Sequence, residues 1–228
     1  ASPRTSTLDE RTPLPMNIHT LAVGQLEANC HIVSDANGQA VLIDAGAEPQ
    51  RILDTLSSLQ LTPVAILLTH AHYDHFGAAT EIQEQTGAPV YIHALDRPML
   101  ISSAKSLAIG LGYGNEYKEP RDIHTFEDGA ELRFSEELTF TVIHTPGHTP
   151  GGSCFRHDNI LFSGDTLFRD SVGRVDFPGG NIKDMRQSLA KLGQLDGDCV
   201  VYCGHYDHTT LSHERTYNHY VNPSLRKR

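Results

Sequence analysis

Four side chains that can bind a metal ion lie within six residues of the sequence, in the run His70-Ala71-His72-Tyr73-Asp74-His75. Three are imidazoles and one is a carboxylate. This mixture suits zinc, iron or manganese, whereas calcium and magnesium prefer ligand sets made of oxygen alone. The ligands stand at positions i, i+2, i+4 and i+5, so they cannot share one helix face as the two histidines of the helical zinc-protease pattern do. We therefore expect them to lie in a loop that folds around two neighbouring ions.

Three further candidate ligands follow, each placed where a turn or a strand end would present it. His148 lies in the stretch 144–152, whose two prolines and three glycines exclude a helix. Asp165 and His205 each come directly after a glycine that ends an apolar run. Asp44 has a similar placement, and we expect it to orient a ligand rather than to bind an ion itself.

Short apolar runs alternate with amphipathic segments, and this rhythm predicts the elements that position the ligands. We expect strands at 18–23, 28–34, 40–43, 64–68, 89–93, 131–134, 138–143, 153–156, 160–163 and 199–203. We expect helices that begin at Pro49, with Ile52, Leu53, Leu56 and Leu59 on the apolar face, and that cover 78–85, 182–192 and part of 209–222. Because the rhythm occurs in two halves, it favours two sheets packed face to face with helices outside.

Two other features have both a structural and a functional interpretation. The segment 102–122 has little periodicity, and a loop of this length is usually functional or mobile. Its apolar side chains could line a substrate entrance or pack only against one another; they are Leu107, Leu111, Tyr113 and Tyr117. His93 and His144 stand at strand ends, where we expect structural roles.

Length, charge and cysteine usage exclude several classes of protein. The chain has 228 residues, enough for one folded domain at 16–228 behind a disordered N-terminal tail at 1–15. A formal net charge of −10 argues against nucleic acid as a partner, which needs a dense cationic surface. The chain contains no apolar run of about 18 residues, so we expect neither a membrane-spanning helix nor a membrane partner. The four cysteines fit neither a disulfide framework nor a structural zinc site, so we expect reduced thiols and a cytoplasmic location.

The candidate ligands also carry a resemblance to a known family. The HxHxDH run at 70–75, His148 in HTPGHTPGG, Asp165 in SGDT and His205 in CGH are similar to the motifs of the metallo-β-lactamase superfamily, in the same order. The resemblance covers about residues 18–205. It implies an α/β fold, a four-layer αββα sandwich, with a dinuclear metal site in the cleft between the sheets.

The resemblance also implies how the ligands divide. One ion would be held by His70, His72 and His148. The other would be held by Asp74, His75 and His205, and Asp165 would bridge the two. Asp74 and Asp165 would be the catalytic carboxylates. The cofactors expected are two divalent ions, with zinc favoured and iron or manganese as alternatives; the pair would lower the pKa of a bridging water and polarise a carbonyl group.

Within the superfamily, the stretch 164–168 followed by 173–180 resembles short, single-domain glyoxalase II-like hydrolases, which cleave thioesters such as S-lactoylglutathione. The resemblance leaves open whether glutathione is the thiol of the substrate, because Tyr206-Asp207 stands where the longer enzymes have Glu-Tyr. The same site fits two alternatives, a lactonase and a persulfide dioxygenase with one iron on His70, His148 and Asp165. Arg174 and Tyr206 are candidate substrate-binding residues; Arg174 could instead pair with Asp176, and Tyr206 could simply pack.

Overall fold

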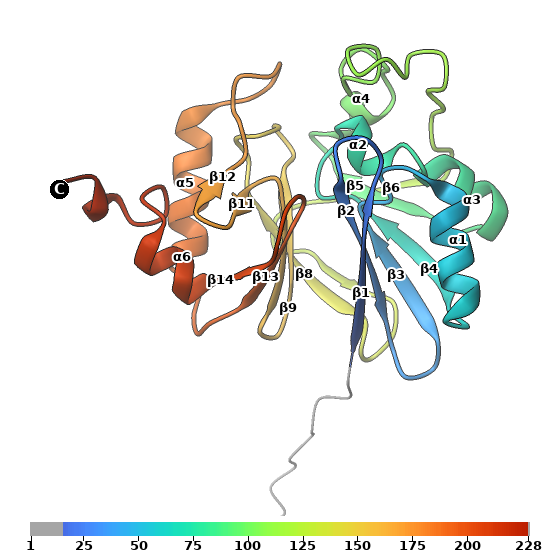
Figure 1. The fold of residues 1–228 in the computed structure, drawn as a ribbon, viewed down its shortest axis with the longest axis horizontal. Helices are drawn as coiled ribbons and strands as arrows, with labels where there is room; N and C mark the ends of the chain where they lie inside the picture. Colours follow the sequence, from blue (N-terminus) through green and yellow to red (C-terminus); the bar gives the residue numbers. More distant parts are fainter. Residues whose placement is uncertain (1–15, 228) are drawn as a thin grey trace, which may run out of the picture.

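The structure, a computed structural model, describes residues 16–227. The tail predicted at residues 1–15 lies outside them. Two six-stranded sheets pack face to face, with helices on both outer faces (Figure 1). This arrangement confirms the four-layer αββα sandwich expected from the sequence.

The first sheet has its strands in the order in which the chain makes them. They are β1 (Asn17–Val23), β2 (Ala28–Ser34), β3 (Gln39–Ile43), β4 (Thr62–Leu67), β5 (Val90–His93) and β6 (Ile123–Phe126). The first three are antiparallel neighbours, and β3 to β6 run parallel. Strands β3 to β5 are largely apolar because helices and the second sheet cover their two faces. Strand β6 was not predicted from the sequence.

The second sheet mixes both directions of pairing. Its order is β14 (Thr209–Thr210), β13 (Val200–Cys203), β10 (Ile160–Gly164), β9 (Ser153–His157), β8 (Thr139–His144) and β7 (Glu131–Arg133). Strands β10 and β13 are parallel and the other neighbours are antiparallel. Because β10 and β13 run parallel, the loops after them meet at one end of the sheet, which is where Asp165 and His205 lie.

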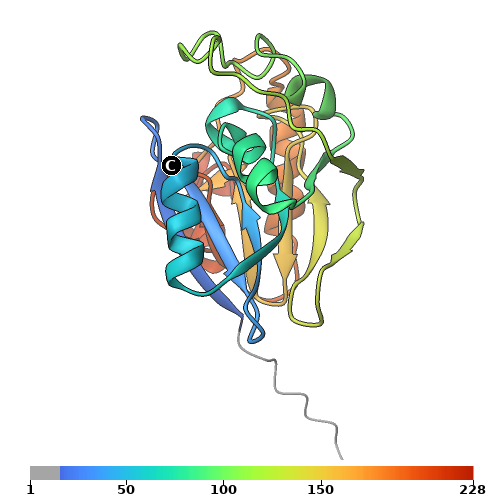
Figure 2. The same ribbon diagram turned by 90° about the vertical axis from the view of Figure 1, so that its right-hand side faces the viewer.

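Helices close both faces of the sandwich. On the outer face of the first sheet lie α1 (Pro49–Ser58) and α3 (Ala79–Thr86) (Figure 2). The outer face of the second sheet is covered by α5 (Ile182–Gly193) and α6 (Leu211–Tyr217). The remaining short elements are α2 (Tyr73–Phe76), α4 (Arg97–Leu100), the hairpin β11 (Leu167–Phe168) with β12 (Ser171–Val172), and a 3₁₀ helix at Pro223–Lys227. None of the helices described is long and apolar enough to cross a bilayer.

The core has three layers that match the sandwich. Between the sheets lie fully buried side chains such as Leu67, Phe140 and Phe162. One outer layer packs α1 and α3 on the first sheet, and the other packs α5 and α6 on the second. One predicted core position is wrong: Leu59 follows the end of α1 and is 44% exposed, because the helix stops at Ser58 before its face returns to the sheet.

Candidate metal centre

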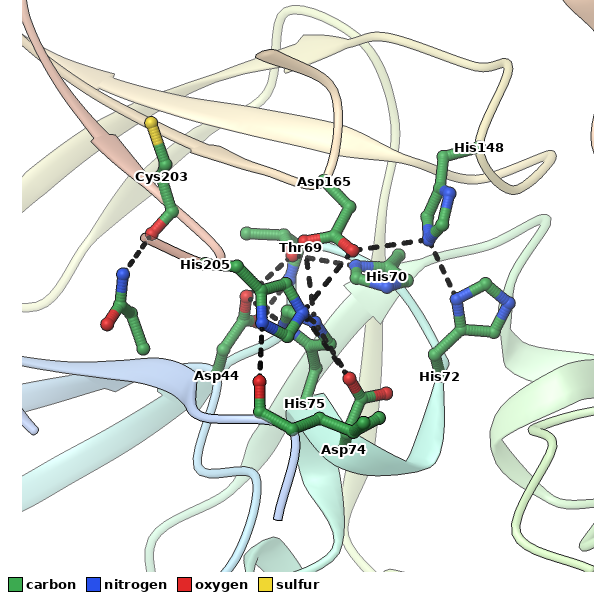
Figure 3. Close-up of polar contacts among 12 residues, drawn as sticks. Asp44, Thr69, His70, His72, Asp74, His75, His148, Asp165, Cys203 and His205 are labelled. Atoms are coloured by element: carbon green, nitrogen blue, oxygen red, sulfur yellow. Dashed lines mark hydrogen bonds and ion pairs between the residues drawn. The ribbon is translucent and has the colours of Figure 1, made fainter. Parts of the chain in front are cut away.

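The seven predicted ligands lie together at one end of the sandwich (Figure 3). His70 and His72 follow β4, and His148 lies in the turn between β8 and β9. Asp165 follows β10 and His205 follows β13. Asp74 and His75 were expected in a loop, but they belong to α2, a single turn of helix. Asp74 and His75 join His205 in one group of possible ligands, whereas His70 and His72 join His148 in another.

A first group consists of three imidazoles, His70, His72 and His148. Their ring nitrogens are close enough to share one ion. His72 Nδ1 lies 2.9 Å from His148 Nε2. The other nitrogen of His148 is held by the backbone, because Nδ1 donates to the Arg174 carbonyl at 2.7 Å. That hydrogen bond leaves Nε2 of His148 with its lone pair toward the centre.

A second group consists of Asp74, His75 and His205, which are also close enough to share one ion. His205 Nε2 lies 3.4 Å from Asp74 Oδ2 and 3.3 Å from His75 Nε2. His205 Nδ1 donates to the Leu26 carbonyl at 3.0 Å, and His75 Nδ1 donates to Asp44 Oδ2 at 2.9 Å. Both rings therefore present Nε2 to the same point.

Asp165 stands between the two groups. Its Oδ2 lies 3.4 Å from His148 Nε2 and 3.6 Å from His205 Nε2, and its Oδ1 lies 3.5 Å from His75 Nε2. A carboxylate with contacts on both sides can bridge two ions. This placement follows the bulge between Phe162 and Gly164 in the pairing of β10 with β13.

The donor atoms fit metal ions. In a tetrahedral site with bonds of 2.0–2.1 Å, neighbouring ligand atoms are about 3.3 Å apart, and the contacts between ligand atoms here run from 2.9 to 3.6 Å. His70 Nε2 and Asp165 Oδ1 are buried without a hydrogen-bond partner among the described residues. A buried polar atom without a partner is costly, so these atoms suit ligation.

The two groups differ in electrostatics. Burial, and then the neighbouring histidines, lower the pKa of His70 well below its usual range and that of His72 to about 3. Burial would also lower the pKa of His75, but Asp165, Asp74 and Asp44 outweigh it and raise that pKa to about 10. The pKa of His205 is raised as well, since the hydrogen bond to Asp74 and the charge of Asp165 outweigh burial.

Asp44 supports both groups from outside, as expected for a residue that orients a ligand. Its carboxylate accepts from the Thr69 backbone N–H at 2.8 Å and from the Thr69 hydroxyl at 2.7 Å. The same hydroxyl accepts from His70 Nδ1 at 3.0 Å. With His75 also bound to Asp44, one buried carboxylate fixes the orientation of a ring in each group.

Sequence reasoning missed Asp96, which joins the two loops of the first group. This fully buried carboxylate accepts from the Ala71 backbone N–H at 3.1 Å, the Thr149 hydroxyl at 2.7 Å and the Gly151 backbone N–H at 2.6 Å. Ala71 lies between two ligands, and Thr149 follows the third. An aspartate three residues beyond the end of a buried strand was the available signal, but nothing local indicates its partners.

Two glycines permit the close approach of the ligand loops. Gly164 has φ +48°, and a Cβ there would collide with the Thr69 side chain. A Cβ on Gly204 would collide with Asp165 Oδ1. The glycine before Asp165 and the glycine before His205 are therefore both required by the packing of the centre.

A cavity of about 370 Å³ opens onto both groups. Its apolar wall includes Leu107 and Leu111 from the long segment and Phe168 and Phe177 opposite. We refer to it as the metal chamber. Tyr113 and Tyr117 do not line it: Tyr113 lines a neighbouring cavity, and the Tyr117 hydroxyl donates to the Leu100 carbonyl at 2.6 Å.

The two candidate substrate-binding residues lie at the rim of the metal chamber. Arg174 forms a bidentate ion pair with Asp176, with both N–O distances at 2.7 Å, and its guanidinium lies 4.0 Å above the Phe177 ring. Tyr206 has φ +63° and a side chain that is 79% exposed.

The other histidines described have structural surroundings. His93 stacks on His144 at 4.1 Å between ring centroids, and His144 Nε2 donates to the Pro150 carbonyl. His213 lies near Asp170 and Glu214 in a separate group of possible ligands. The Glu214 carboxylate, however, already accepts from Thr209, Asn218 and the Asp170 backbone.

An αββα sandwich that collects histidines and aspartates at one end of both sheets defines the class of metallo-hydrolases. The chain belongs to the Metallo-beta-lactamase superfamily, whose family model matches residues 23–205.

Relatives match over nearly the whole chain. An uncharacterized protein of Aquifex aeolicus is 36% identical over 92% of this chain and 99% of its own. Hydroxyacylglutathione hydrolase GloC of Haemophilus influenzae is 31% identical over 91% of this chain and 99% of its own.

Solved structures agree with the fold. BLEG-1 B3 metallo-beta-lactamase superposes with TM-score 0.84 at 32% identity, over 90% of this chain and 100% of that one. TTHA1623 in a di-iron-bound form superposes with TM-score 0.80 at 39% identity, over 88% and 98%. ETHE1 from Myxococcus xanthus superposes with TM-score 0.73 at 28% identity, over 89% and 83%.

Proposed function

We propose that this metallo-hydrolase cleaves a thioester, such as S-lactoylglutathione, at a centre of two divalent ions. The observation that carries the proposal is the pair of ligand groups that share Asp165 and face one solvent-accessible chamber. A structural metal site is closed by its own ligands, whereas this one faces a cavity large enough for a substrate. The similarity to the GloC hydrolase supports the thioester as substrate.

The ligands are assigned as the two groups define them. His70, His72 and His148 would hold one ion and Asp74, His75 and His205 the other, and Asp165, which contacts both groups, would serve both ions. Two ions held there supply an activated water at neutral pH and polarise the scissile carbonyl. Zinc suits the donor set, and the di-iron form of TTHA1623 makes iron the alternative to test.

The protein's own carboxylates handle the proton. Of the described residues that line the metal chamber, Asp74 and Asp165 alone carry carboxylates. They are the groups that would accept a proton from a water activated at the centre, which is our reason for placing both in catalysis. The leaving thiol has an ordinary pKa of about 8.5 and departs as a thiolate with little help from an acid.

Substrate is held by the apolar walls and by the rim. Leu107, Leu111 and Phe177 exclude water from the bound acyl or thiol chain. Arg174 is 57% exposed despite its ion pair, so its remaining N–H groups can meet a substrate carboxylate. Tyr206, at the same rim, offers a hydroxyl to the substrate.

A paired assay tests the reaction class. Protein loaded with zinc or with iron is given S-lactoylglutathione and, separately, glutathione persulfide, while thiol release and oxygen uptake are recorded. We expect thiol release without oxygen uptake. Oxygen uptake with the persulfide, with one iron per chain, would assign a dioxygenase that uses His70, His148 and Asp165. A lactone and a β-lactam belong in the same panel, the latter because of the similarity to BLEG-1.

A further inference from the structure

A second cavity, of about 390 Å³, adjoins the metal chamber. The two share Leu26 and Asp74 in their linings, so the turn between β1 and β2 and the start of α2 form the partition. Residues of α3 and of the segment 113–118 complete the second cavity. We call it the side chamber.

The side chamber has an excess of carboxylates that are free to bind. Glu81 and Glu116 line it, and neither side chain forms an ion pair or hydrogen bond within the described part of the chain. Glu48 lines it too, but its carboxylate is occupied by Arg51 at 3.0 Å and by the Gly24 backbone N–H at 3.1 Å. Against these stands one cation of the lining, Lys118. The chamber therefore has a net negative charge.

A buried phenol without a partner also faces the side chamber. Tyr73 is only 7% exposed, lines the chamber, and its hydroxyl forms no hydrogen bond with any described residue. Its ring lies 5.3 Å from the ring of Tyr113, which also lines the chamber. Glu116 lines the same cavity. The Tyr73 hydroxyl is therefore free to bond a polar ligand in the chamber.

We propose that the side chamber binds an ammonium group of the substrate while the scissile bond lies at the metal centre. Two free carboxylates attract the charge, the two tyrosine rings attract a cation through their faces, and the Tyr73 hydroxyl accepts a hydrogen bond. Leu26 and Asp74 border both chambers, so a group bound in the side chamber lies next to the metal centre. The proposal rests on the proposed hydrolase for the position of the reacting bond.

Other occupants fit the side chamber less well. A carboxylate could meet Lys118, but Glu81 and Glu116 would repel it, since like charges at short range are unfavourable. A metal ion needs ligand atoms that converge, and the described groups close enough to share an ion do not include Glu81 or Glu116. An organic cation, which contacts carboxylates and aromatic rings over a wider area, remains.

Matched thioesters test the proposal. One pair keeps the lactoyl group and varies the thiol, with thiocholine against 3,3-dimethylbutanethiol. The other keeps N-acetylcysteamine as the thiol and varies the acyl group, with 3-aminopropanoyl against butanoyl. In at least one pair we expect kcat/KM to be about tenfold higher for the ammonium compound, the size of one well-placed cation contact. Equal values in both pairs would overturn the proposal.

Charge variants locate the effect. In the double variant Glu81→Gln/Glu116→Gln the ratio of kcat/KM for the ammonium thioester to that for its neutral counterpart should fall toward one. The value of kcat/KM for the neutral thioester should stay within about twofold. The control Glu119→Gln/Glu136→Gln removes the same charge from two glutamates that do not line the chamber and should keep the preference. A preference that survives in the first double variant would contradict the assignment, as would its loss in the control.

A binding measurement separates this proposal from the proposed function. The amide analogue of the preferred ammonium thioester is titrated into metal-loaded protein by calorimetry, at constant ionic strength. Binding that is lost in Glu81→Gln/Glu116→Gln supports the side chamber even if no thioester is hydrolysed. Hydrolysis of the neutral thioesters without binding of the ammonium analogue would support the proposed hydrolase and contradict the proposed ammonium site in the side chamber.

Discussion

The two ligand groups of the centre are built differently. His70, His72 and His148 are imidazoles that are no more than 4% exposed. The second group includes a carboxylate, and the side chains of Asp74 and His205 are 17% and 15% exposed. The first group is held by loops that Asp96 joins, and the second by a helical turn and by the Leu26 carbonyl.

This difference in composition produces a difference in affinity for protons. Without an ion, His70 and His72 are neutral at pH 7 because their pKa values are lowered, and they are ready to bind a metal. His75 and His205 have raised pKa values because carboxylates surround them. An ion that enters the second group must therefore displace protons, whereas one that enters the first meets free lone pairs.

Replacement of Asp165 should have the largest effect, because this residue contacts both groups. In Asp165→Ala the bridge is lost, and we expect kcat to fall by roughly a thousandfold or more, equivalent to several kcal/mol of transition-state stabilisation. Metal analysis of the purified variant should show fewer than two ions per chain. A variant with two ions and full activity would refute the bridging assignment.

Acidification should lower the metal affinity of the second group more than that of the first. Between pH 8 and pH 6 the second group should lose affinity by about tenfold per pH unit, because the ion displaces a proton from His75, whose pKa is raised to about 10, and the raised pKa of His205 adds to this loss. The first group should change much less, since His70 and His72 remain neutral in this range. Zinc titrations of metal-depleted protein against a competing chelator at several pH values measure both constants. Parallel pH dependence of the two would contradict the comparison.

Substitution of Asp96 should weaken the first group selectively. In Asp96→Asn one of the two acceptor oxygens becomes a donor that faces the N–H of Gly151 or the donors from Ala71 and Thr149. We expect at least about a tenfold loss of affinity for the first ion, the usual cost of disturbing a ligand's support, with the second ion unchanged.

Asp198→Asn is the matched control, because Asp198 also accepts three hydrogen bonds, from Cys199 and Ser212, but supports no ligand. Equal losses of metal in the two variants would show that Asp96 acts through general stability alone.

Arg174 should have the smallest effect on the centre itself. Its ion pair with Asp176 is exposed, and such pairs contribute about 0–1 kcal/mol to stability. Arg174→Ala should therefore leave the midpoint of thermal unfolding and the metal content nearly unchanged. If Arg174 meets a substrate carboxylate, KM for S-lactoylglutathione should rise by about tenfold, while a thioester without a carboxylate should be hydrolysed as before.

The sequence predicted those parts of the molecule that depend on local patterns. Apolar runs placed most of the strands, and the dense run at 70–75 together with His148, Asp165 and His205 indicated the residues that the structure brings together. The helical turn α2 was missed, because four residues are too few for a periodic pattern. The contacts of Asp96 and of the Leu26 carbonyl were missed as well, since their partners lie up to 55 and 179 residues away.

The side chamber shows the same limit. Tyr73, Glu81 and Glu116 carry no shared motif, and Tyr113 was considered only for the substrate entrance or for packing within its own segment. They line one cavity because α2, α3 and the segment 113–118 meet beside the turn between β1 and β2. A set of residues drawn from four elements has no signature in the sequence of any one of them.

The hairpin of β1 and β2 is fastened to the last ligand loop. The Asn29 side chain donates to the carbonyls of Cys203 and Tyr206, and the Leu26 carbonyl holds the His205 ring, across separations of 174 to 179 residues. The second ion can therefore be captured only after the two halves of the chain have docked. During refolding, binding of that ion would report the docking of the two halves, a step that comes after each sheet has formed.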